Sequence, residues 1–511
     1  MKYLSIISLS VLITVAGCTR LEPKLYSDLT TANAYSTESD INAALVGVYA
    51  DLNPYPGDAW MYYAGYLVMT TDYSTDMGFS TAAGDPTKMS NFTYDDNNRY
   101  IRYNWQYMYN VISNVNLLLS KIEGVQMDET KKKRIIGQAR FLRALAYRDI
   151  TDAWGPAPLY TKVVAPEETV NAALAPVAEI DQVIIDDCKF GIDNLPENWD
   201  NSEGMSRATK GACATLLANV YMRAHDYASA KTYVDMVLAM RNAGIYELNS
   251  DFKNVWSENN KFDKGFIFCI LHEPGMNGGE ITNHYGPQDH KEVTNRWQYY
   301  AVSLEFWRKY SDQDPRKQFF YYNYEGASPR DENTENGFYY MVPNPGQTTP
   351  PSDTVKFLKN VATKKYSYEM VSNSYYDGRT IAIFRIEDVI LYKAEIENEI
   401  NGPTAALTYI NEIRARAGAP EYGSGPGFPI PATKEEMVQK ILDERGFELV
   451  FEYKRRPDLI RLGKYESTCN AYLTERGLPA IVTPKLKYLP YPLVDAQLNT
   501  NMAAENLNRL P

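Results

Sequence analysis

The sequence predicts a mainly α-helical fold in which helix pairs form a scaffold, interrupted by long irregular loop regions and a few short strands. Three observations predict it. Apolar residues recur at helical spacing over much of the chain, beginning with Ile41, Leu45 and Val48. Strand-like runs are few and short, and the clearest is FIFCI at residues 266–270. Two helical segments also repeat the same pattern of small and larger apolar residues.

The chain begins with an export signal. A short positive start is followed by an apolar run over residues 3–16, which ends in VAGC at residues 15–18. The run is shorter than the roughly 20 residues that span a bilayer, and small residues precede the cysteine. A lipobox has this form, so we expect residues 1–17 to be a lipoprotein signal peptide, Cys18 to be lipidated and residues 18–36 to form a lipid-anchored tether. The alternative is an ordinary cleavage site beside an incidental cysteine.

The helical body starts after this tether. Ser36 or Thr37 can accept backbone N–H bonds at the start of the first helix, and acidic residues fill its first turn. Near the other end of the chain, Thr433 with Glu436 three residues later has the form of a capping box. Helical spacing predicts further helices at about residues 103–121, 131–152, 177–190, 207–224, 227–241, 383–400, 403–417 and 433–453.

Two of the predicted helix pairs repeat each other. In the first pair Ala218 is followed by Ala230, and in the second Ala394 is followed by Ala406 at the same spacing. Larger apolar residues stand one turn further on in both copies. Small residues where two helices of a hairpin cross are needed by a tetratricopeptide-like pair. We therefore predict tetratricopeptide-like helix pairs, although any antiparallel pair uses small residues somewhere.

Two long irregular regions interrupt the helices, at about residues 53–100 and 249–382. Both are rich in Gly, Asn, Asp, Pro and aromatic residues. Loops of this size are uncommon in compact domains unless they serve a function. The predicted regions after the tether are an N-terminal helical region (37–248), an irregular loop-rich region (249–382) and a C-terminal helical region (383–511).

Composition narrows the range of partners. The 511 residues carry a formal net charge of -12, with Lys and Arg dispersed, which argues against nucleic acid and against anionic lipid as ligands. No stretch after the signal is long and apolar enough for a transmembrane helix, so we expect membrane contact through the lipid anchor only. The other cysteines lack metal-binding spacing and are expected to be free buried thiols. The alternative is that two of them form a disulfide in an oxidising compartment. They are Cys188, Cys213, Cys269 and Cys469.

Five segments, in order along the chain, resemble one known family. The most distinctive is ARFLRALAY at residues 139–147, which runs into WGPAPL at residues 154–159. The other four lie at residues 32–52, 207–220, 385–418 and 441–463, and a closing motif lies at residues 488–493 with LNTN at 498–501. On these segments the chain resembles the SusD/RagB family of Bacteroidetes surface lipoproteins, from the lipobox to the last residues.

The resemblance implies a helical fold of tetratricopeptide-like pairs with an irregular ligand-binding half laid over it. It also implies a partner, a SusC-like TonB-dependent transporter, to which the lipoprotein delivers glycans or peptides. It places the chain at the cell outer membrane, lipid-anchored and facing outwards. Most of these motifs are scaffold in the family, so they do not name the ligand, and variable loop lengths prevent transfer of binding residues.

Aromatic side chains in the two irregular regions are the candidate ligand platforms. Sugar rings stack their C–H faces on Trp and Tyr, while polar groups bind the hydroxyls at the rim. Trp60, Tyr73 and Trp297 are the first choices because turn-forming or polar neighbours favour their exposure. For any one of them the alternative is a local core beneath a long loop. The predicted ligand-binding residues are Trp60, Tyr66, Asp72, Tyr73, Asp76, Trp297, Tyr299 and Tyr339.

Motifs for metal binding and catalysis are missing. The histidines of one Gly-rich loop and two nearby glutamates lack zinc-ligand spacing; they are His272, His284, His290, Glu273 and Glu280. Acidic clusters at residues 95–98 and 312–314 lack a full calcium loop, and the sequence does not decide whether a structural calcium is bound. GSGPG at residues 423–427 lacks the strand-to-helix context of a nucleophile elbow. We expect no catalytic residue, no metal site and no cofactor.

The function predicted from the sequence is non-catalytic capture of an oligosaccharide at the cell surface and its delivery to the transporter. Two alternatives stay open. One is a peptide-binding member of the same family, whose site would rely on backbone hydrogen bonds. The other is a surface glycosidase, whose carboxylate pair cannot be picked out from sequence. A purely structural lid, with ligand contacts supplied by the transporter, is a third reading.

Overall fold

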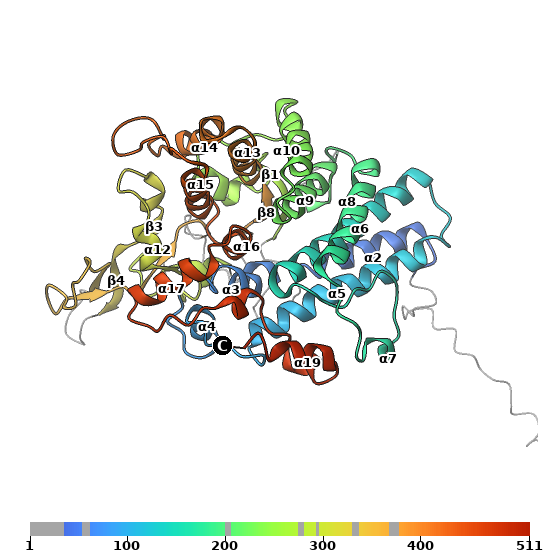
Figure 1. Cartoon of the computed structure of the whole chain (residues 1–511), viewed down its shortest axis with the longest axis horizontal. Coiled ribbons are helices and arrows are strands. Elements are labelled where there is room, and N and C mark those ends of the chain that lie inside the picture. The colour runs from blue at the N-terminus through green and yellow to red at the C-terminus, as the bar shows by residue number, and fades with distance from the viewer. Residues whose placement is uncertain are drawn as a thin grey trace, which may run out of the picture.

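The protein is mainly helical, which confirms the predicted fold class. The structure, a computed structural model, describes residues 35–53, 62–199, 206–273, 281–292, 296–329, 337–366 and 378–510. Cys18 and Trp60 lie outside these described residues. In Figure 1 the long helices fill the right and the top of the molecule, and short helices and strands fill its left and lower parts.

The long helices form a continuous succession. Their bounds are α2 Glu38–Ala50, α5 Arg99–Ile122, α6 Glu129–Trp154, α8 Val177–Asn194, α9 Lys210–Arg223, α10 Tyr227–Asn242, α13 Ile386–Asn401, α14 Pro403–Ala417 and α15 Lys434–Glu448. α6 packs on α5 and α8, α8 on α9, and α9 on α10. The succession continues through α13, which packs on α10, α14 and α15. Each helix therefore covers the apolar face of its neighbour.

Local capping signals set where helices begin. The Thr37 hydroxyl accepts from the N–H of Asp40 (3.2 Å), and the Asp40 carboxylate accepts from the N–H of Thr37 (2.9 Å). This reciprocal pair starts α2 and confirms the predicted cap. Thr433 caps α15, because its hydroxyl accepts from the N–H of Glu436 (3.1 Å), but the Glu436 carboxylate accepts from the N–H of Ala432 (2.7 Å) and not from that of Thr433.

One predicted helix end is wrong. α15 stops at Glu448 instead of continuing to about residue 453. Phe451 and Tyr453 take left-handed φ values of 56 and 68, which no α-helix contains. The Asp72 carboxylate accepts from the N–H of Tyr453 (3.0 Å) and so holds the chain in this non-helical path.

The repeated alanines lie inside their helix pairs. Ala218 in α9, Ala230 in α10, Ala394 in α13 and Ala406 in α14 are all 0% exposed. The larger residues one turn further on are equally buried; they are Val234, Val237, Ile410 and Ile413. Because a methyl side chain takes little room, the two helices of each pair can approach closely where the alanines meet the partner helix.

Short strands form three small sheets. β1 Phe266–Ile270 pairs antiparallel with β8 Ile381–Arg385, which confirms the strand predicted at residues 266–270. A second sheet has the order β2 Val302–Ser303, β7 Asn360–Thr363, β3 Phe320–Tyr321. In the third, β4 Asn323–Pro329 pairs antiparallel with β5 Gly337–Met341, and β5 pairs parallel with β6 Val355–Phe357. The β4–β5–β6 sheet extends to the left of Figure 1.

Short helices connect these parts. The α-helical ones are α3 Leu67–Thr71, α4 Asp85–Ser90, α7 Pro166–Thr169, α11 Ile281–Tyr285, α12 Leu304–Arg308, α16 Arg455–Arg461, α17 Tyr465–Glu475, α18 Leu493–Ala496 and α19 Thr500–Asn506. The others are a π-helix η1 Tyr62–Tyr66 and the 3-10 helices η3 Asn254–Trp256, η4 Glu258–Asn260, η5 Pro315–Gln318 and η6 Pro484–Lys487.

Buried ion pairs tie the irregular half to the helices. Arg385, at the end of β8, donates to Glu448 (2.7 Å) and to Glu452 (2.7 Å). Arg455 of α16 donates to both carboxylate oxygens of Asp76, at 2.9 Å each. All five side chains are 3% exposed or less. Removing one partner of such a pair leaves a buried charge unpaired, so these pairs fix the loops against the helices.

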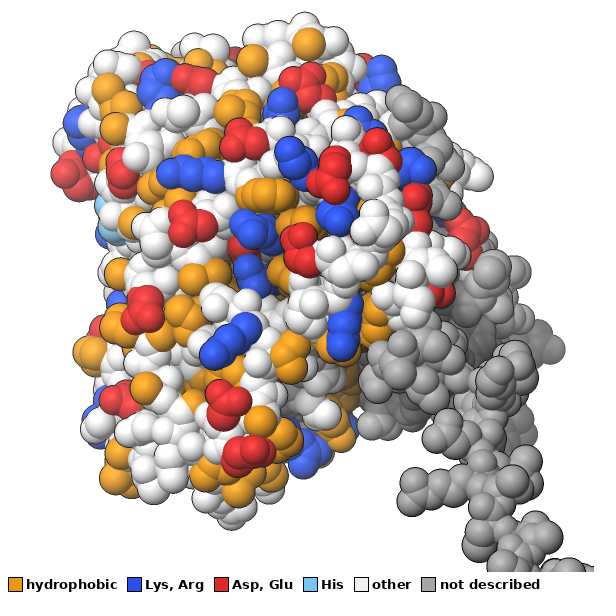
Figure 2. Space-filling view, turned by 90° about the vertical axis from the view of Figure 1, so that its right-hand side faces the viewer, with side chains coloured by type: hydrophobic (Ala, Val, Ile, Leu, Met, Phe, Trp, Pro, Cys, Tyr) orange, Lys and Arg blue, Asp and Glu red, His pale blue; other side chains and the backbone are white. Residues whose placement is uncertain are grey.

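The surface mixes both signs of charge. On the face shown in Figure 2, Lys and Arg side chains are interspersed with Asp and Glu. Within the described residues, no helix combines the length and the apolar character needed to cross a bilayer.

Candidate ligand-binding surface

Four residues predicted to bind ligand are core residues instead. Tyr66 is 1% exposed, and Asp72, Tyr73 and Asp76 are 0% exposed. The Tyr73 hydroxyl accepts from the N–H of Ala301 and donates to a backbone carbonyl of the segment 299–301. The second irregular region therefore covers the first. These four side chains are predicted to contact a ligand, but none of them reaches the surface of this structure.

The two aspartates are internal anchors. Asp72 accepts from the N–H groups of Tyr453 (3.0 Å) and Arg455 (3.2 Å), and burial raises its pKa to about 7. Burial also opposes ionisation of Asp76, but Arg455 and Lys309 hold the pKa of that carboxyl well below its ordinary value. Both carboxylates are engaged by donors of the chain itself.

Trp297 stands at the surface, as its polar neighbours predicted. It is 42% exposed. Its segment runs back along α11, because the N–H of Trp297 donates to the carbonyl of Asn283 (2.8 Å) and the N–H of Tyr300 donates to that of His284 (3.0 Å). These bonds fix the backbone on α11 and leave a large part of the indole in solvent.

Gln298 explains why its neighbour Trp297 faces outwards. Gln298 takes a left-handed φ of 49, an uncommon conformation for a residue other than glycine. Its side chain turns inwards, where Nε2 donates to Asn360 Oδ1 (2.7 Å) and Oε1 accepts from the N–H of Gln288 (2.9 Å). With residue 298 anchored inside, Trp297 and the partly exposed Tyr299 lie at the surface.

His284 supports the exposed indole from behind. Its ring centroid lies 4.8 Å from that of Trp297, 5.9 Å from Tyr299 and 5.7 Å from Tyr300. His284 is 3% exposed, and this burial lowers its pKa to about 3. The imidazole is therefore neutral at ordinary pH and acts as one more aromatic ring under the platform.

Tyr299 and Arg99 form the polar edge of the platform. Arg99 Nη2 donates to the hydroxyls of Tyr299 (2.7 Å) and Tyr100 (3.0 Å). Both Tyr299 and Arg99 are partly exposed. An exposed aromatic face beside hydroxyl and guanidinium groups is the combination that binds a sugar ring and its hydroxyls.

Arg99 was missed by the sequence prediction. It is the first residue of α5, where Asn98 caps the helix by accepting from the N–H of Tyr100 (3.0 Å). A cation at a helix N-terminus opposes the helix dipole. A residue that breaks a local rule in this way often serves a functional site, so this mismatch is the signal that could have found Arg99.

Tyr339 is exposed on a different element. It lies on β5, is 41% exposed, and pairs with Glu325 of β4. The next residue, Tyr340, faces the other side of the sheet, where it stacks on Tyr324 with ring centroids 5.1 Å apart. Within the described residues, no ring contact joins Tyr339 to Trp297, so the structure does not bring these two predicted residues into one platform.

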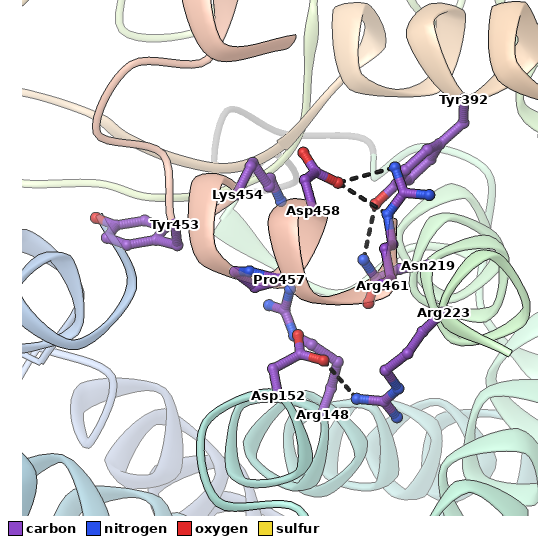
Figure 3. A pocket seen from close by; sticks show the side chains of 10 residues that line it. All are labelled: Arg148, Asp152, Asn219, Arg223, Tyr392, Tyr453, Lys454, Pro457, Asp458 and Arg461. Atoms are coloured by element: carbon purple, nitrogen blue, oxygen red, sulfur yellow. Dashed lines mark hydrogen bonds and ion pairs between the residues drawn. The ribbon is translucent and has the colours of Figure 1, made fainter. Parts of the chain in front are cut away.

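Figure 3 shows a small pocket between α6, α9, α13 and α16. Buried charged groups line it, with ion pairs between Arg223 and Asp152 and between Arg461 and Asp458 (2.9 Å). Asn219 donates to the hydroxyl of Tyr392 (2.8 Å) at its upper edge. The lining side chains are engaged with one another, so we regard this pocket as part of the scaffold.

The described histidines and acids do not form a metal centre. No group of three or more His, Cys, Asp or Glu side chains in the described ranges could hold a metal ion. His272 is 1% exposed, its Nδ1 is 2.7 Å from the carbonyl oxygen of Arg379, and burial lowers its pKa to about 4. Glu280, from the same predicted loop, lies outside the described residues.

Comparison with known families covers both helical regions. Residues 271–503 match the SusD family, and residues 21–222 match a family described as starch-binding associating with outer membrane. The chain is a member of the SusD/RagB family. The two matches together include all the long helices except α10, the irregular region with Trp297 and the closing motif at residues 488–501.

Individual SusD relatives agree over nearly the whole chain. SusD-like protein P2 of Formosa agariphila is 26% identical over 479 residues, which is 90% of this chain and 91% of the relative. A SusD-like carbohydrate-binding protein from Bacteroides fragilis has a TM-score of 0.73 at 20% identity, covering 92% of this chain and 99% of that one. A laminarin-binding SusD-like protein has a TM-score of 0.70 at 22% identity, covering 91% and 98%. At these identities, the solved structures establish the SusD fold.

Proposed function

We propose that this SusD/RagB member is a lipid-anchored protein on the outer face of the outer membrane that binds an oligosaccharide and delivers it to a SusC-like TonB-dependent transporter. It acts by binding, without catalysis and without a cofactor. The observation that carries the proposal is the exposed indole of Trp297, supported by His284 and edged by Tyr299 and Arg99. The starch-binding description of the matched family and the laminarin-binding relative also support a glycan ligand.

The geometry favours a sugar ring over an extended peptide. A peptide site gains most of its affinity from free backbone donors and acceptors at a sheet edge or groove. Here the backbone N–H groups of residues 297, 298 and 300 are already bonded to residues 283, 286 and 284. What the segment offers to solvent is an aromatic face with polar groups beside it, and C–H faces of sugars stack on such rings.

Trp297→Ala tests the platform. We expect soluble oligosaccharides from a polysaccharide panel to bind this variant more weakly by on the order of 1 kcal/mol, about fivefold in Kd, as measured by calorimetry. The matched control is Phe262→Ala, because Phe262 is an exposed aromatic residue of similar exposure (40%, against 42% for Trp297) away from this segment. Equal affinity of the Trp297 variant and the wild type would contradict the proposed site. Trp60→Ala stays a parallel prediction of the same size.

Two further measurements separate the alternatives. Quenching of tryptophan fluorescence by polysaccharides but not by peptides supports a glycan ligand, and the opposite result supports the peptide-binding alternative. Release of reducing sugars during incubation with a bound polysaccharide would identify a glycosidase and overturn the non-catalytic proposal.

The anchor and the partner are tested separately. Cys18→Ser should abolish lipid attachment and leave the signal peptide uncleaved. Protease treatment of intact cells should degrade the wild-type protein if it faces outwards. The transporter should be recovered with the lipoprotein after mild detergent extraction, and its absence from the purified complex would contradict the delivery role.

A further inference from the structure

Two buried cysteines meet between α8 and α9. Cys188 lies on α8 and Cys213 on α9, both are 0% exposed, and both are free in this structure. The two helices pack side by side (Figure 1). The Cys213 thiol lies close enough to Cys188 to contribute, after burial, to the raised pKa of the Cys188 thiol.

Gly191 leaves room for the Cys213 side chain to approach α8 at this point. It follows Cys188 by three residues, which places both on the same face of α8. A Cβ atom on Gly191 would lie 2.4 Å from the sulfur of Cys213, closer than any real contact. Close approach of two backbones is the condition for a disulfide, whose Cα atoms are usually within about 7 Å.

The other two cysteines lie elsewhere in the fold. Cys269 belongs to β1, and Cys469 belongs to α17. Both are fully buried, like the pair. Burial raises the pKa of the Cys269 thiol. They therefore serve as internal controls for a reaction that depends on two neighbouring thiols.

We propose that Cys188 and Cys213 form a disulfide between α8 and α9 while the exported chain folds, by exchange with the disulfide of a thiol oxidoreductase. One cysteine thiolate attacks the donor disulfide and forms a mixed disulfide. The second cysteine thiolate then displaces the donor sulfur, and the two protons pass to the donor. Two cysteines are oxidised to one cystine, and the donor disulfide is reduced to two thiols. Exported proteins meet such donors, whereas cytosolic thiols are kept reduced.

The timing follows from burial. Burial, assisted by the neighbouring Cys213 thiol, raises the pKa of the Cys188 thiol well above its ordinary value. The thiolate is the reactive form, and a buried thiol also excludes the donor. The exchange must therefore occur before α8 and α9 close. Once formed, the disulfide would be protected from reductants by the same burial.

The decisive measurement uses protein purified from outer membranes of cells that export it. Free thiols are blocked with iodoacetamide in denaturant, disulfides are then reduced, and the released thiols are labelled with N-ethylmaleimide and located by mass spectrometry. We expect the second label on Cys188 and Cys213 and the first on Cys269 and Cys469. Recovery of all four thiols with the first label would overturn the proposal.

A refolding experiment tests the geometry independently of export. The mature chain, unfolded and fully reduced, is refolded with oxidised glutathione. We expect a Cys188–Cys213 link in the wild type and in Cys269→Ala, but not in Cys188→Ala. Folded reduced protein exposed to the same reagent should gain the link at least tenfold more slowly. A refolded wild type without this link, or folded protein that oxidises equally fast, would contradict the proposed pairing or its timing.

Discussion

Replacing His284 with phenylalanine should make the stability of this protein less sensitive to acid. His284 lies behind Trp297, and burial lowers its pKa from 6.5 to about 3. The unfolded chain therefore takes up a proton at this residue as the pH falls below 6.5, while the folded protein does not. The stabilisation is fully present above pH 6.5 and is lost as the pH falls from there towards about 3.

The size of the expected loss in unfolding free energy depends on how much of the pH range between 6.5 and about 3 the experiment crosses. Between about pH 7.5 and about pH 5, only the interval of about 1.5 units below 6.5 contributes. At roughly 1.36 kcal/mol per unit, the wild type should lose about 2 kcal/mol of unfolding free energy through this residue. His284→Phe keeps an aromatic ring behind Trp297 but does not titrate. It should lose about 2 kcal/mol less than the wild type over the same change of pH.

The assay is urea denaturation of the wild type and the variant at both pH values. For each protein, the unfolding free energy at the lower pH is subtracted from that at the higher pH. Comparing these two differences cancels the contribution of other groups, such as His272, that titrate equally in both proteins. The matched control is His225→Asn, because His225 is exposed and asparagine tolerates its left-handed φ of 57. Equal acid sensitivity of the wild type and His284→Phe would refute the assignment of a buried, neutral imidazole behind the platform.

Three further substitutions test the scaffold by chemical denaturation. Gly155→Ala should cost about 2–4 kcal/mol, because Gly155 has φ +70 and its Cβ would lie 2.6 Å from the ring of Tyr488; unchanged stability would contradict that packing. Arg143→Met should cost about 3–5 kcal/mol, because it leaves the buried carboxylate of Asp187 without its two 2.8 Å bonds, and adding Asp187→Leu should recover most of the loss. Tyr73→Phe should cost about 1–2 kcal/mol through lost hydroxyl bonds and leave glycan affinity unchanged. Weakened binding by a stable Tyr73→Phe would restore Tyr73 to the site.

The helices were predictable because their signals are local. Thr37 and Asp40 cap α2 within one turn of chain, and the alanines of the two helix pairs need only a neighbouring helix to be buried. The end of α15 was not predictable in this way. The apolar spacing continues past Glu448, and the chain leaves the helix where Asp72, distant in sequence, accepts from the N–H of Tyr453.

The candidate site also combines features that the local sequence predicts with features that depend on contacts distant in sequence. Trp297 and Tyr73 both lie in irregular regions rich in aromatic and polar residues, and composition gave equal reason to place them at the surface. The structure exposes Trp297 and buries Tyr73, whose hydroxyl is bonded to residues 299 and 301. Arg99 was passed over because its partner Tyr299 is distant in sequence, although its place at a helix N-terminus was visible.

By itself, then, the sequence determined the helix starts, the short strand at residues 266–270 and the family, because each depends on neighbouring residues or on motifs in order along the chain. Only the tertiary structure decided which aromatic residues form a surface and which form the core. Burial of a side chain depends on what another segment places in front of it. For Tyr73 that segment lies 226 to 228 residues further along the chain, so the residues around Tyr73 in the sequence do not reveal its burial.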